Sequence, residues 1–493
     1  MLYLPGQILE LLLFTPPLWR FRRVLAPITL VTISFSSAVI FMTDINLLTG
    51  GMLLLALFRL INILRISHGR MHEAYLRRVT FRSSLWLIIY FIILAVSYLL
   101  FESFVGLGNL PTIYAWTCLA LSVFIFIETM RNIRKTRHLS VLEHYSDKEL
   151  PTVTIAIPAR NETRDLEECI KSILANNYPK LEILVLDDCS QDRTPEIIRK
   201  FAQDGVRFIP GKEPDDRWLA KNQAYEHLYK AANGELVLFC GVDVRFGADA
   251  VRAMVTSMIN RKKDMLSILP RRLSGSSSAA LIQPMRYWWE LVLPRRFFNR
   301  PPVLSTCWLI KRNTLKKLGG FAAVSHAIIP EGYFAREIIK HDGYSFIRAD
   351  DLLDVQTRKD LFQQREMALR MRYPQLRRKL ELVLTVVLVH ALFLIGPFLY
   401  GLSGFWLGFD GSKLITWAAF GTLLLTHLTI VQITSPANIL IAVINLPVVL
   451  ITEIVLGLAS MWKYEFAEVE WKDRNICIPV MHVIPHLPNL PKR

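Results

Sequence analysis

Two stretches decide the fold of this chain: Val-Thr-Ile-Ala-Ile-Pro-Ala-Arg-Asn-Glu at residues 153–162 and Leu-Glu-Ile-Leu-Val-Leu-Asp-Asp-Cys-Ser at residues 181–190. Each opens with a short apolar run typical of a buried strand and ends in polar residues. Between them, residues 165–175 have the apolar spacing of a helix. The alternation continues with strands at 206–209 and 235–240 and with helices from Thr194, as N-cap before Pro195, and at 221–232. The sequence therefore predicts an α/β domain with an open, mostly parallel sheet and helices on both faces.

Polar residues gather where these strands end, which is the edge where such sheets bind ligands. They fall in four groups: Pro158 to Glu162, Asp187 with Asp188, Trp218 to Lys221, and Asp243. The chain has neither Gly-x-Gly-x-x-Gly nor Gly-x-x-x-x-Gly-Lys-[Ser/Thr], which disfavours dinucleotide and P-loop chemistry. Carboxylates at a phosphate site make chemical sense when Mg²⁺ or Mn²⁺ lies between them and a diphosphate.

Long apolar segments flank this domain on both sides. With 52% hydrophobic residues, 20% charged residues and a mean hydropathy of +0.32, the 493-residue chain is typical of a membrane protein rather than a disordered chain, a coiled coil or a small disulfide scaffold. Runs that approach the roughly 20 residues needed to cross a bilayer lie at 24–42, 47–64, 83–101, 111–130, 380–400, 414–431 and 437–460. We therefore divide the chain into a transmembrane block at 1–130, a soluble domain at 131–379, a second transmembrane block at 380–460 and a tail at 461–493.

The net charge of +16 has two explanations. Nucleic-acid binding is one, but no RNA-binding motif of aromatic and basic residues occurs, and the basic residues cluster beside apolar segments, as the positive-inside rule and anionic lipid require. They are Arg20, Arg22 and Arg23; Arg65, Arg70, Arg77, Arg78 and Arg82; and Arg131, Arg134, Lys135 and Arg137, whereas the loops at 44–46 and 102–109 carry none. This pattern predicts a multi-pass cell-membrane protein whose soluble domain is cytoplasmic. The six cysteines, without Cys-x-x-Cys spacing, fit a reducing compartment and disfavour a zinc or redox site.

The second transmembrane block leaves the side of the tail open. Three full spans would put the tail outside, yet the tail carries Lys463, Lys472, Arg474, Lys492 and Arg493. One stretch is therefore re-entrant or split, and the interruptions between Pro436 and Pro447 favour the last one.

Four polar side chains fall inside the predicted spans. Arg59 lies near the inner end of its span and can snorkel to the interface. Glu453, His390 and His427 either line a lipid or substrate cavity or hydrogen-bond between helices.

The order and spacing of the polar motifs resemble those of the family-2 glycosyltransferases, which have an A-type nucleotide-sugar fold, over roughly residues 151–351. Two segments resemble the part of the family that binds the nucleoside: Pro158-Ala-Arg160-Asn161-Glu162 resembles the opening strand motif beside the nucleobase, and Asp187-Asp188-Cys189-Ser190 resembles the Asp-Asp-x-Ser that holds the nucleoside. Trp218-Leu-Ala-Lys221 resembles the Trp-x-Gly-Lys near the diphosphate. Gly241-Val-Asp243 falls where the family has its metal-binding Asp-x-Asp, and Pro330-Glu331-Gly332 falls where it has its catalytic carboxylate. The tail Val469-Glu-Trp471-Lys472-Asp-Arg474 is similar to that of the carotenoid-acid and hopene-associated glycosyltransferases.

The resemblance implies an inverting membrane glycosyltransferase that moves a sugar from a nucleotide-sugar donor, a UDP-sugar, to a lipid acceptor. It makes Glu331 the catalytic base and Asp243 the ligand of Mg²⁺ or Mn²⁺. The donor-binding residues would be Pro158, Arg160, Glu162, Asp187, Asp188, Lys221 and Asp243, and the acceptor or tail element would be Trp218, Trp471, Lys472 and Arg474.

This sequence departs from the family pattern in three places. Gly241 replaces the first Asp of Asp-x-Asp, Ala220 replaces a glycine, and the Gln-x-x-Arg-Trp of processive synthases is absent. The last difference counts against the alternative of a polysaccharide synthase. Gly241 supports another alternative, a non-catalytic membrane scaffold with a degenerate nucleotide-sugar domain.

Each candidate also has a structural explanation. Asp187 and Asp243 can cap turns, Lys221 can be a solvated helix residue, and Glu331 can be an acid at a helix N-terminus. The basic residues between Arg365 and Lys379 fit an interfacial helix on anionic lipid or a site near acceptor or phosphate. The segment Tyr287-Trp288-Trp289 fits an interfacial segment or the wall of an acceptor groove.

Overall fold

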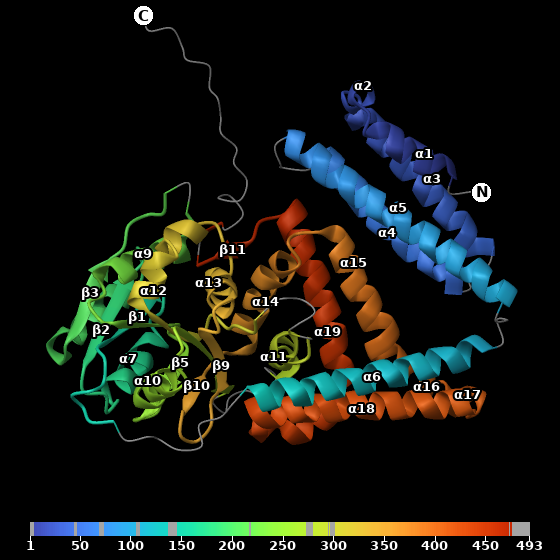
Figure 1. The fold of residues 1–493 in the computed structure, drawn as a ribbon. Coiled ribbons are helices and arrows are strands. Elements are labelled where there is room, and N and C mark those ends of the chain that lie inside the picture. The colour runs from blue at the N-terminus through green and yellow to red at the C-terminus, as the bar shows by residue number, and fades with distance from the viewer. Residues whose placement is uncertain are drawn as a thin grey trace, which may run out of the picture. The chain divides into compact units, whose positions relative to one another are not determined.

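The computed structural model describes residues 4–43, 47–68, 73–104, 109–136, 145–215, 218–272, 280–293, 295, 301–472 and 474–475 (Figure 1). They form two compact units, a sheet unit at 120–366 and 419–453 and a helical unit at 1–119, 367–418 and 454–493. Each unit is described by itself. Some residues on which the predicted membrane orientation depends lie outside the described residues: Arg70, Arg137, Lys492, Arg493, the loop at 44–46 and residues 105–108.

A seven-stranded sheet forms the centre of the sheet unit, with the order β3-β2-β1-β4-β8-β6-β9 (Figure 1). Its strands are β1 Val153–Ala159, β2 Leu181–Asp187, β3 Val206–Pro210, β4 Leu236–Cys240, β6 Met265–Leu269, β8 Cys307–Lys311 and β9 Tyr344–Arg348. β3, β2, β1 and β4 are parallel, β8 is antiparallel to both β4 and β6, and β6 is parallel to β9. The sheet is therefore mostly parallel, as the sequence predicts.

A second, three-stranded sheet extends the edge where β4 ends. It has the order β5-β10-β7, with β5 Val244–Phe246, β10 Val355–Thr357 and β7 Arg271–Arg272. Val244 of β5 lies opposite Thr357 of β10 in an antiparallel register, and Thr357 lies opposite Arg272 of β7. Because Asp243 immediately precedes β5, this pairing brings the end of β10 beside Asp243.

Helices between the strands complete the sheet unit. They are α7 Leu166–Leu174, α8 Thr194–Lys200, α9 Ala220–Ala231, α10 Ala250–Asn260, α11 Gln283–Leu291, α12 Arg312–Lys317 and α13 Pro330–Ile339. The predicted helix start at Thr194 is wrong by one residue, because Arg193 is the N-cap and Thr194 is the first helical residue. The buried Thr194 hydroxyl instead accepts the backbone N–H of Glu162 at 2.8 Å, which ties the loop after β1 to α8.

Two clusters of buried side chains, one mainly aliphatic and one aromatic, pack against the sheet. Aliphatic residues of β1, β2 and β4 pack with α7 and α10, as in the contacts around Ile155 and Ile170. A cluster of aromatic rings is centred on the fully buried Trp308, whose ring stacks on Phe239 with the centroids 4.5 Å apart and lies 6.1 Å from Phe334 of α13. Aromatic pairs of this kind add about 0.5–1.5 kcal/mol beyond area burial, so this cluster fixes α13 on the sheet.

The rest of the described chain is helical. Its elements are α1 Leu4–Leu13, α2 Pro16–Trp19, α3 Arg22–Thr43, α4 Leu47–His68, α5 Glu73–Phe104, α6 Leu110–Lys135, α14 Leu361–Gln375, α15 Leu380–Val389, a π-helical turn His390–Ile395, α16 Gly396–Leu402, α17 Gly404–Leu407, α18 Gly411–Thr434, α19 Ile439–Phe466 and the ribbon strands β11 Glu470–Trp471 and β12 Arg474–Asn475. Only part of the predicted basic helix forms, because α14 ends at Gln375, and Arg377 and Arg378 follow with φ of 55° and 53°.

Five helices within the described residues are long and apolar enough to cross a membrane, at Gly50–Ser67, Leu110–Lys135, Leu380–Leu407, Gly411–Thr434 and Pro436–Phe466. The other two predicted spans, 24–42 and 83–101, lie within α3 and α5. The expectation that the last stretch is split is wrong, because α19 continues through Asn445 and Pro447 as one helix. The other expectation, that one stretch is re-entrant, stays a prediction.

A buried polar network joins three helices of the helical unit. The Arg59 side chain on α4 is 1% exposed, and its Nε donates to Glu10 Oε2 of α1 at 2.7 Å. The other carboxylate oxygen of Glu10 accepts the Ser84 hydroxyl of α5 at 2.5 Å. The prediction that Arg59 snorkels is therefore wrong. A charge inside a helix bundle is stable when paired, and Glu10 supplies the partner.

We expect Arg59→Met to lower the stability of the full chain by about 3–5 kcal/mol, because the change leaves the Glu10 carboxylate buried without its cation. The double variant E10Q/R59M should be more stable than R59M alone. Thermal unfolding of the purified chain in detergent measures both. The matched control is Arg131→Met, which breaks the more exposed Arg131–Glu128 pair at 3.1 Å and should cost at most about 1 kcal/mol. Equal losses in R59M and the double variant would refute the pairing argument.

Candidate active site

The loops that follow β1 and β2 are held together by their own polar groups. Ala159 at the end of β1 lies opposite Asp187 of β2, and Pro158 lies opposite Leu186. The buried Arg160 donates Nη1 to the carbonyls of Asp188 at 2.7 Å and Cys189 at 2.8 Å. Asn161 and Cys189 adopt left-handed φ angles of 49° and 55°. Arg160 therefore shapes the loop that carries the acidic pair, a role that residue type alone did not indicate.

Both acidic residues predicted at the end of β2 lie at this edge and are buried. The carboxylate of Asp187 accepts the backbone N–H of Ser190 at 3.3 and 3.4 Å, so the structural role as a turn cap is present. The backbone N–H of Asp188 donates to Ala159 at 2.8 Å. Gly211 after β3 approaches so closely that a Cβ there would lie 2.4 Å from the Asp187 carbonyl oxygen. A glycine is therefore required to close this corner of the site.

The N-terminus of α9 brings Lys221 into the same region. Lys221 Nζ lies 5.2 Å from the centre of the Tyr225 ring, a cation–π distance. The buried Asn222 donates Nδ2 to the carbonyls of Val324, Ser325 and Ala327 at 2.8–3.0 Å. These bonds fix the start of α9 against the segment that leads into α13, and they hold Lys221 in place relative to Glu331. Trp218 is half-buried just before α9.

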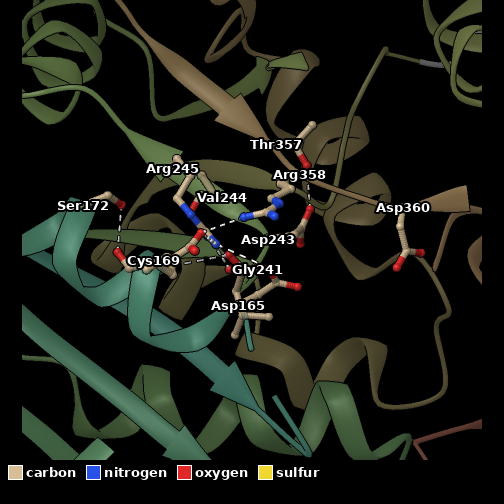
Figure 2. A network of polar contacts seen from close by, with 12 residues as sticks. Asp165, Cys169, Ser172, Gly241, Asp243, Val244, Arg245, Thr357, Arg358 and Asp360 are labelled. Carbon is tan, nitrogen blue, oxygen red and sulfur yellow. Dashed lines mark hydrogen bonds and ion pairs between the residues drawn. The ribbon is translucent and has the colours of Figure 1, made fainter. Parts of the chain in front are cut away.

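Asp243 is the centre of a polar network (Figure 2). Its Oδ2 accepts the Thr357 hydroxyl at 2.6 Å and lies 3.3 Å from Lys359 Nζ, while its backbone carbonyl accepts the Arg358 N–H at 2.9 Å. Burial raises the pKa of Asp243, but Lys359, together with Thr357 and the nearby Arg286, outweighs burial and holds the pKa below its usual value. Asp243 is therefore ionised at neutral pH.

The chemistry of Asp243 fits a divalent cation that also binds a diphosphate. Mg²⁺ is usually held by one or two carboxylates and by substrate phosphates, and Asp243 supplies one carboxylate. Among the described residues, no group of three or more His, Cys, Asp or Glu side chains could hold a metal ion.

Glu331 lies in the first turn of α13 and is 1% exposed. Within the described part of the chain, its Oε2 has no hydrogen-bond partner. Burial raises the pKa of Glu331, and the positive charges of Lys221 and Arg286 oppose this effect without cancelling it. A buried acceptor without a donor is costly for stability, so a merely structural acid at a helix end does not explain this side chain.

Sequence analysis missed two basic residues of this cluster. Arg286 on α11 is close enough to lower the pKa of both Asp243 and Glu331, and its Nη2 donates to Thr306 Oγ1 at 3.3 Å. Lys359 follows the short strand β10. The strand before it was not predicted from the sequence, so no local pattern singled out Lys359. The carboxylates of Glu331 and Asp243 also help raise the pKa of the buried Tyr225 hydroxyl, after burial itself, so the site gathers around Tyr225.

Helix α11 links this cluster to the apolar helices of the same unit. Tyr287 and Trp288 are buried, and Trp289 donates Nε1 to Glu453 of α19 at 3.2 Å. The ring centroids of Trp288 and His427 of α18 are 6.2 Å apart, and Asn132 of α6 donates to the Leu291 carbonyl at 2.8 Å. Glu453 therefore makes a hydrogen bond between helices, and the aromatic segment packs against α18 and α19.

The tail motif lies in the helical unit. Trp471 and Arg474 lie opposite each other in the antiparallel ribbon β11–β12, and Lys472 at the turn has a φ of 50°. The side chains of Trp471 and Arg474 lie outside the described structure. The role of this element stays a prediction.

Comparison with known proteins agrees with this architecture. Residues 154–319 match the family described as glycosyl transferase family 2. The probable glycosyltransferase YdaM of Bacillus subtilis (strain 168) is 28% identical over 201 residues, 39% of this chain and 46% of that protein. The 4,4'-diaponeurosporenoate glycosyltransferase of Staphylococcus aureus (strain N315) is 27% identical over 171 residues, 34% of this chain and 42% of that protein. The matches thus span less than half of either relative.

Among solved structures, the mannosyltransferase PcManGT from Pyrobaculum calidifontis, in complex with GDP-Man and Mn²⁺, is 18% identical with a TM-score of 0.43, covering 71% of this chain and 99% of that one. The predicted fold class, an A-type nucleotide-sugar domain with flanking apolar helices, is confirmed by the family match and the mostly parallel sheet.

We expect Glu331→Gln to raise the melting temperature at pH 8, because burial disfavours the ionised carboxylate. Each kcal/mol gained in the free energy of unfolding should raise it by about 2–4 °C. The pKa of this acid is higher in the folded state, so wild-type stability rises as pH falls from that raised pKa to the ordinary value of about 4.5. The gain of the variant should therefore shrink over that range and disappear below it. Melting curves from pH 4 to 8 measure this trend.

The matched control is Glu337→Gln on the same helix, whose partly exposed carboxylate pairs with Lys340 at 2.7 Å and should give no such gain. A Glu331→Gln gain that does not change with pH would contradict the electrostatic explanation.

Proposed function

We propose that this chain is a membrane-bound inverting glycosyltransferase, a proposal supported by the match of residues 154–319 to glycosyl transferase family 2. It moves a sugar from a nucleotide-sugar, a UDP-sugar, to the hydroxyl of a lipid acceptor. The observation that carries the proposal is Glu331, a buried carboxylate with one oxygen that has no hydrogen-bond partner among the residues the structure describes. Glu331 is grouped with Lys221, Arg286 and Asp243 near the edge where such sheets bind ligands.

The donor would bind along the strand ends. Asp187 and Asp188 lie where a nucleoside would be held, with the loop containing Pro158, Arg160 and Glu162 beside them. Lys221 would face the diphosphate. Asp243 would hold Mg²⁺ or Mn²⁺, which supplies neutralising charge for a leaving diphosphate when bound.

Glu331 would act as the general base. Its carboxylate takes the proton of the acceptor hydroxyl while that oxygen forms a bond to the anomeric carbon. The bond from the anomeric carbon to the diphosphate oxygen breaks on the opposite side, so the configuration inverts and the electron pair leaves with the diphosphate. The raised pKa of Glu331 suits a base that must hold a proton in a buried site.

The acceptor would reach the site from the membrane. Support comes from α11, which carries Arg286 near Glu331 and packs its aromatic residues against α18 and α19 within one unit. A lipid headgroup at this helix would lie beside both the apolar helices and the base. Trp218 and the tail residues Trp471, Lys472 and Arg474 are the further acceptor candidates.

We propose that the domain and the tail are cytoplasmic, which the distribution of basic residues supports. With a cytoplasmic domain, this side for the tail requires one of the three C-terminal apolar helices to be re-entrant instead of crossing the membrane. With the native cysteines replaced by serine, a cysteine at Asn475, beside Arg474, should not react with an impermeant maleimide in intact cells. A cysteine at Asn109, in a loop without basic residues, is the matched control and should react. Labelling at position 475 in intact cells would contradict the proposed side of the tail.

We expect Glu331→Gln to lower turnover by about two to four orders of magnitude, because an amide cannot accept the proton. UDP affinity should stay unchanged, since the side chain keeps its size. Transfer of labelled sugar from UDP-sugars to a lipid extract measures turnover, and calorimetry measures UDP binding.

Glu331→Asp should keep partial activity, and Glu337→Gln should keep full activity as the control on the same helix. Wild-type turnover in Glu331→Gln would remove the catalytic role from this residue. A wild-type chain that neither transfers nor hydrolyses any donor would instead favour the scaffold alternative.

A further inference from the structure

Lys359 forms an ion pair with Asp243, the residue proposed to hold the metal ion. Its Nζ is 3.3 Å from Asp243 Oδ2, and the two side chains are 21% and 15% exposed. The contact is built by strand pairing, because Thr357 lies opposite Val244 and the Arg358 N–H donates to the Asp243 carbonyl at 2.9 Å (Figure 2). The backbone of β10 therefore places Lys359 beside Asp243, so the ion pair is not a chance contact of two surface side chains.

Gly241 contributes to the same arrangement. A Cβ at residue 241 would lie 2.6 Å from Asp243 Oδ1. The Asp243 carboxylate can therefore take its present position only because residue 241 has no side chain. Position 241 also supplies no second carboxylate. One negative charge at Asp243 is then balanced by one positive charge at Lys359, which leaves little attraction for a divalent cation in the absence of donor.

A nucleoside diphosphate would change this balance. It brings several anionic oxygens, which attract both an ammonium group and a divalent cation. The lysine side chain has a flexible four-carbon stem, so Nζ can move from Asp243 to a phosphate oxygen while the backbone of β10 stays in place. Asp243 is then available to the metal.

On the basis of the proposed function, we propose that Lys359 is a donor-binding residue that pairs with Asp243 in the free protein and transfers to the diphosphate when donor and metal bind together. Metal binding at Asp243 therefore requires the nucleotide. Lys359 would also help to neutralise the negative charge of the leaving diphosphate. Because position 241 has no carboxylate, the metal is held less tightly and does not balance that charge alone.

The test uses the purified full chain, with Mn²⁺ and UDP as probes. Electron paramagnetic resonance counts bound Mn²⁺, and calorimetry measures UDP affinity. The wild type should bind Mn²⁺ only with UDP present. Lys359→Met should weaken UDP binding in Mn²⁺ about tenfold or more and should allow Mn²⁺ to bind without UDP. Gly241→Asp should also bind Mn²⁺ without UDP, because it adds a carboxylate and its Cβ, 2.6 Å from the present position of Asp243 Oδ1, forces the Asp243 side chain to shift.

Two further variants act as controls. Lys359→Arg keeps the charge and should keep UDP affinity within a few fold, which separates lost charge from lost folding. Lys340→Met removes a lysine that pairs with Glu337 on the surface of the same unit, and it should behave as wild type.

Three results would overturn the inference: a Lys359→Met protein with wild-type affinities for both probes, wild-type protein that binds Mn²⁺ alone, or UDP binding that is equally tight in chelator. Failure of the proposed function gives a different result, in which wild-type protein binds none of UDP, GDP and dTDP with or without Mn²⁺.

Discussion

The parallel pairing of β1 with β2 and with β4 determines where three carboxylates of the site lie, those of Asp187, Asp188 and Asp243. Parallel strands end at the same edge, so Asp187, Asp188 and Asp243 gather there even though they are far apart in the sequence. Burial disfavours the ionised forms of Asp243 and of Glu331 on α13. The cations that oppose this effect are Lys221 on α9, Arg286 on α11 and Lys359 after β10. Arg286 and Lys359 follow Asp243 in the chain, so later segments complete an electrostatic arrangement that the strand ends begin.

Features of the fold and of the site could be predicted from the sequence where neighbouring residues determine them, and could not where residues far apart in the sequence determine them. Strands β1 to β4 and helices α7 and α9 follow from local periodicity, and the sequence predicts each to within about two residues. The antiparallel strand β8, which pairs with both β4 and β6, is a long-range feature with no such signal. Lys359 reaches Asp243 only because β5 pairs with β10, and the contact between Asp243 and Thr357 joins residues 114 positions apart. Basic residues are too common in this chain for composition to single out this one.

The chain handles buried charge in two ways. Glu10 and Arg59 have each other and Ser84 as partners, so their burial holds helices together. Glu331 is equally buried, yet one of its oxygens has no partner among the described residues. Since a buried, unsatisfied carboxylate lowers stability, its presence calls for a chemical reason. The paired state of Arg59 was not predicted because its partner lies 49 positions away. Glu331 was named as a candidate only through the resemblance of Pro330-Glu331-Gly332 to the family motif, and the sequence did not indicate its burial.

Helix α11 shows that the apolar helices of the sheet unit do more than anchor it. Arg286 and Trp289 are three residues apart, so they lie on neighbouring parts of one helix face. Trp289 binds Glu453 of α19, and Arg286 binds Thr306, whose carbonyl in turn accepts the N–H of Gly241 at 3.1 Å. A shift of α19 that carried α11 with it would therefore change the distance from Arg286 to Asp243 and Glu331. The geometry of the polar site consequently depends on helices that are long and apolar enough for a membrane, which is a physical reason for one chain to contain both.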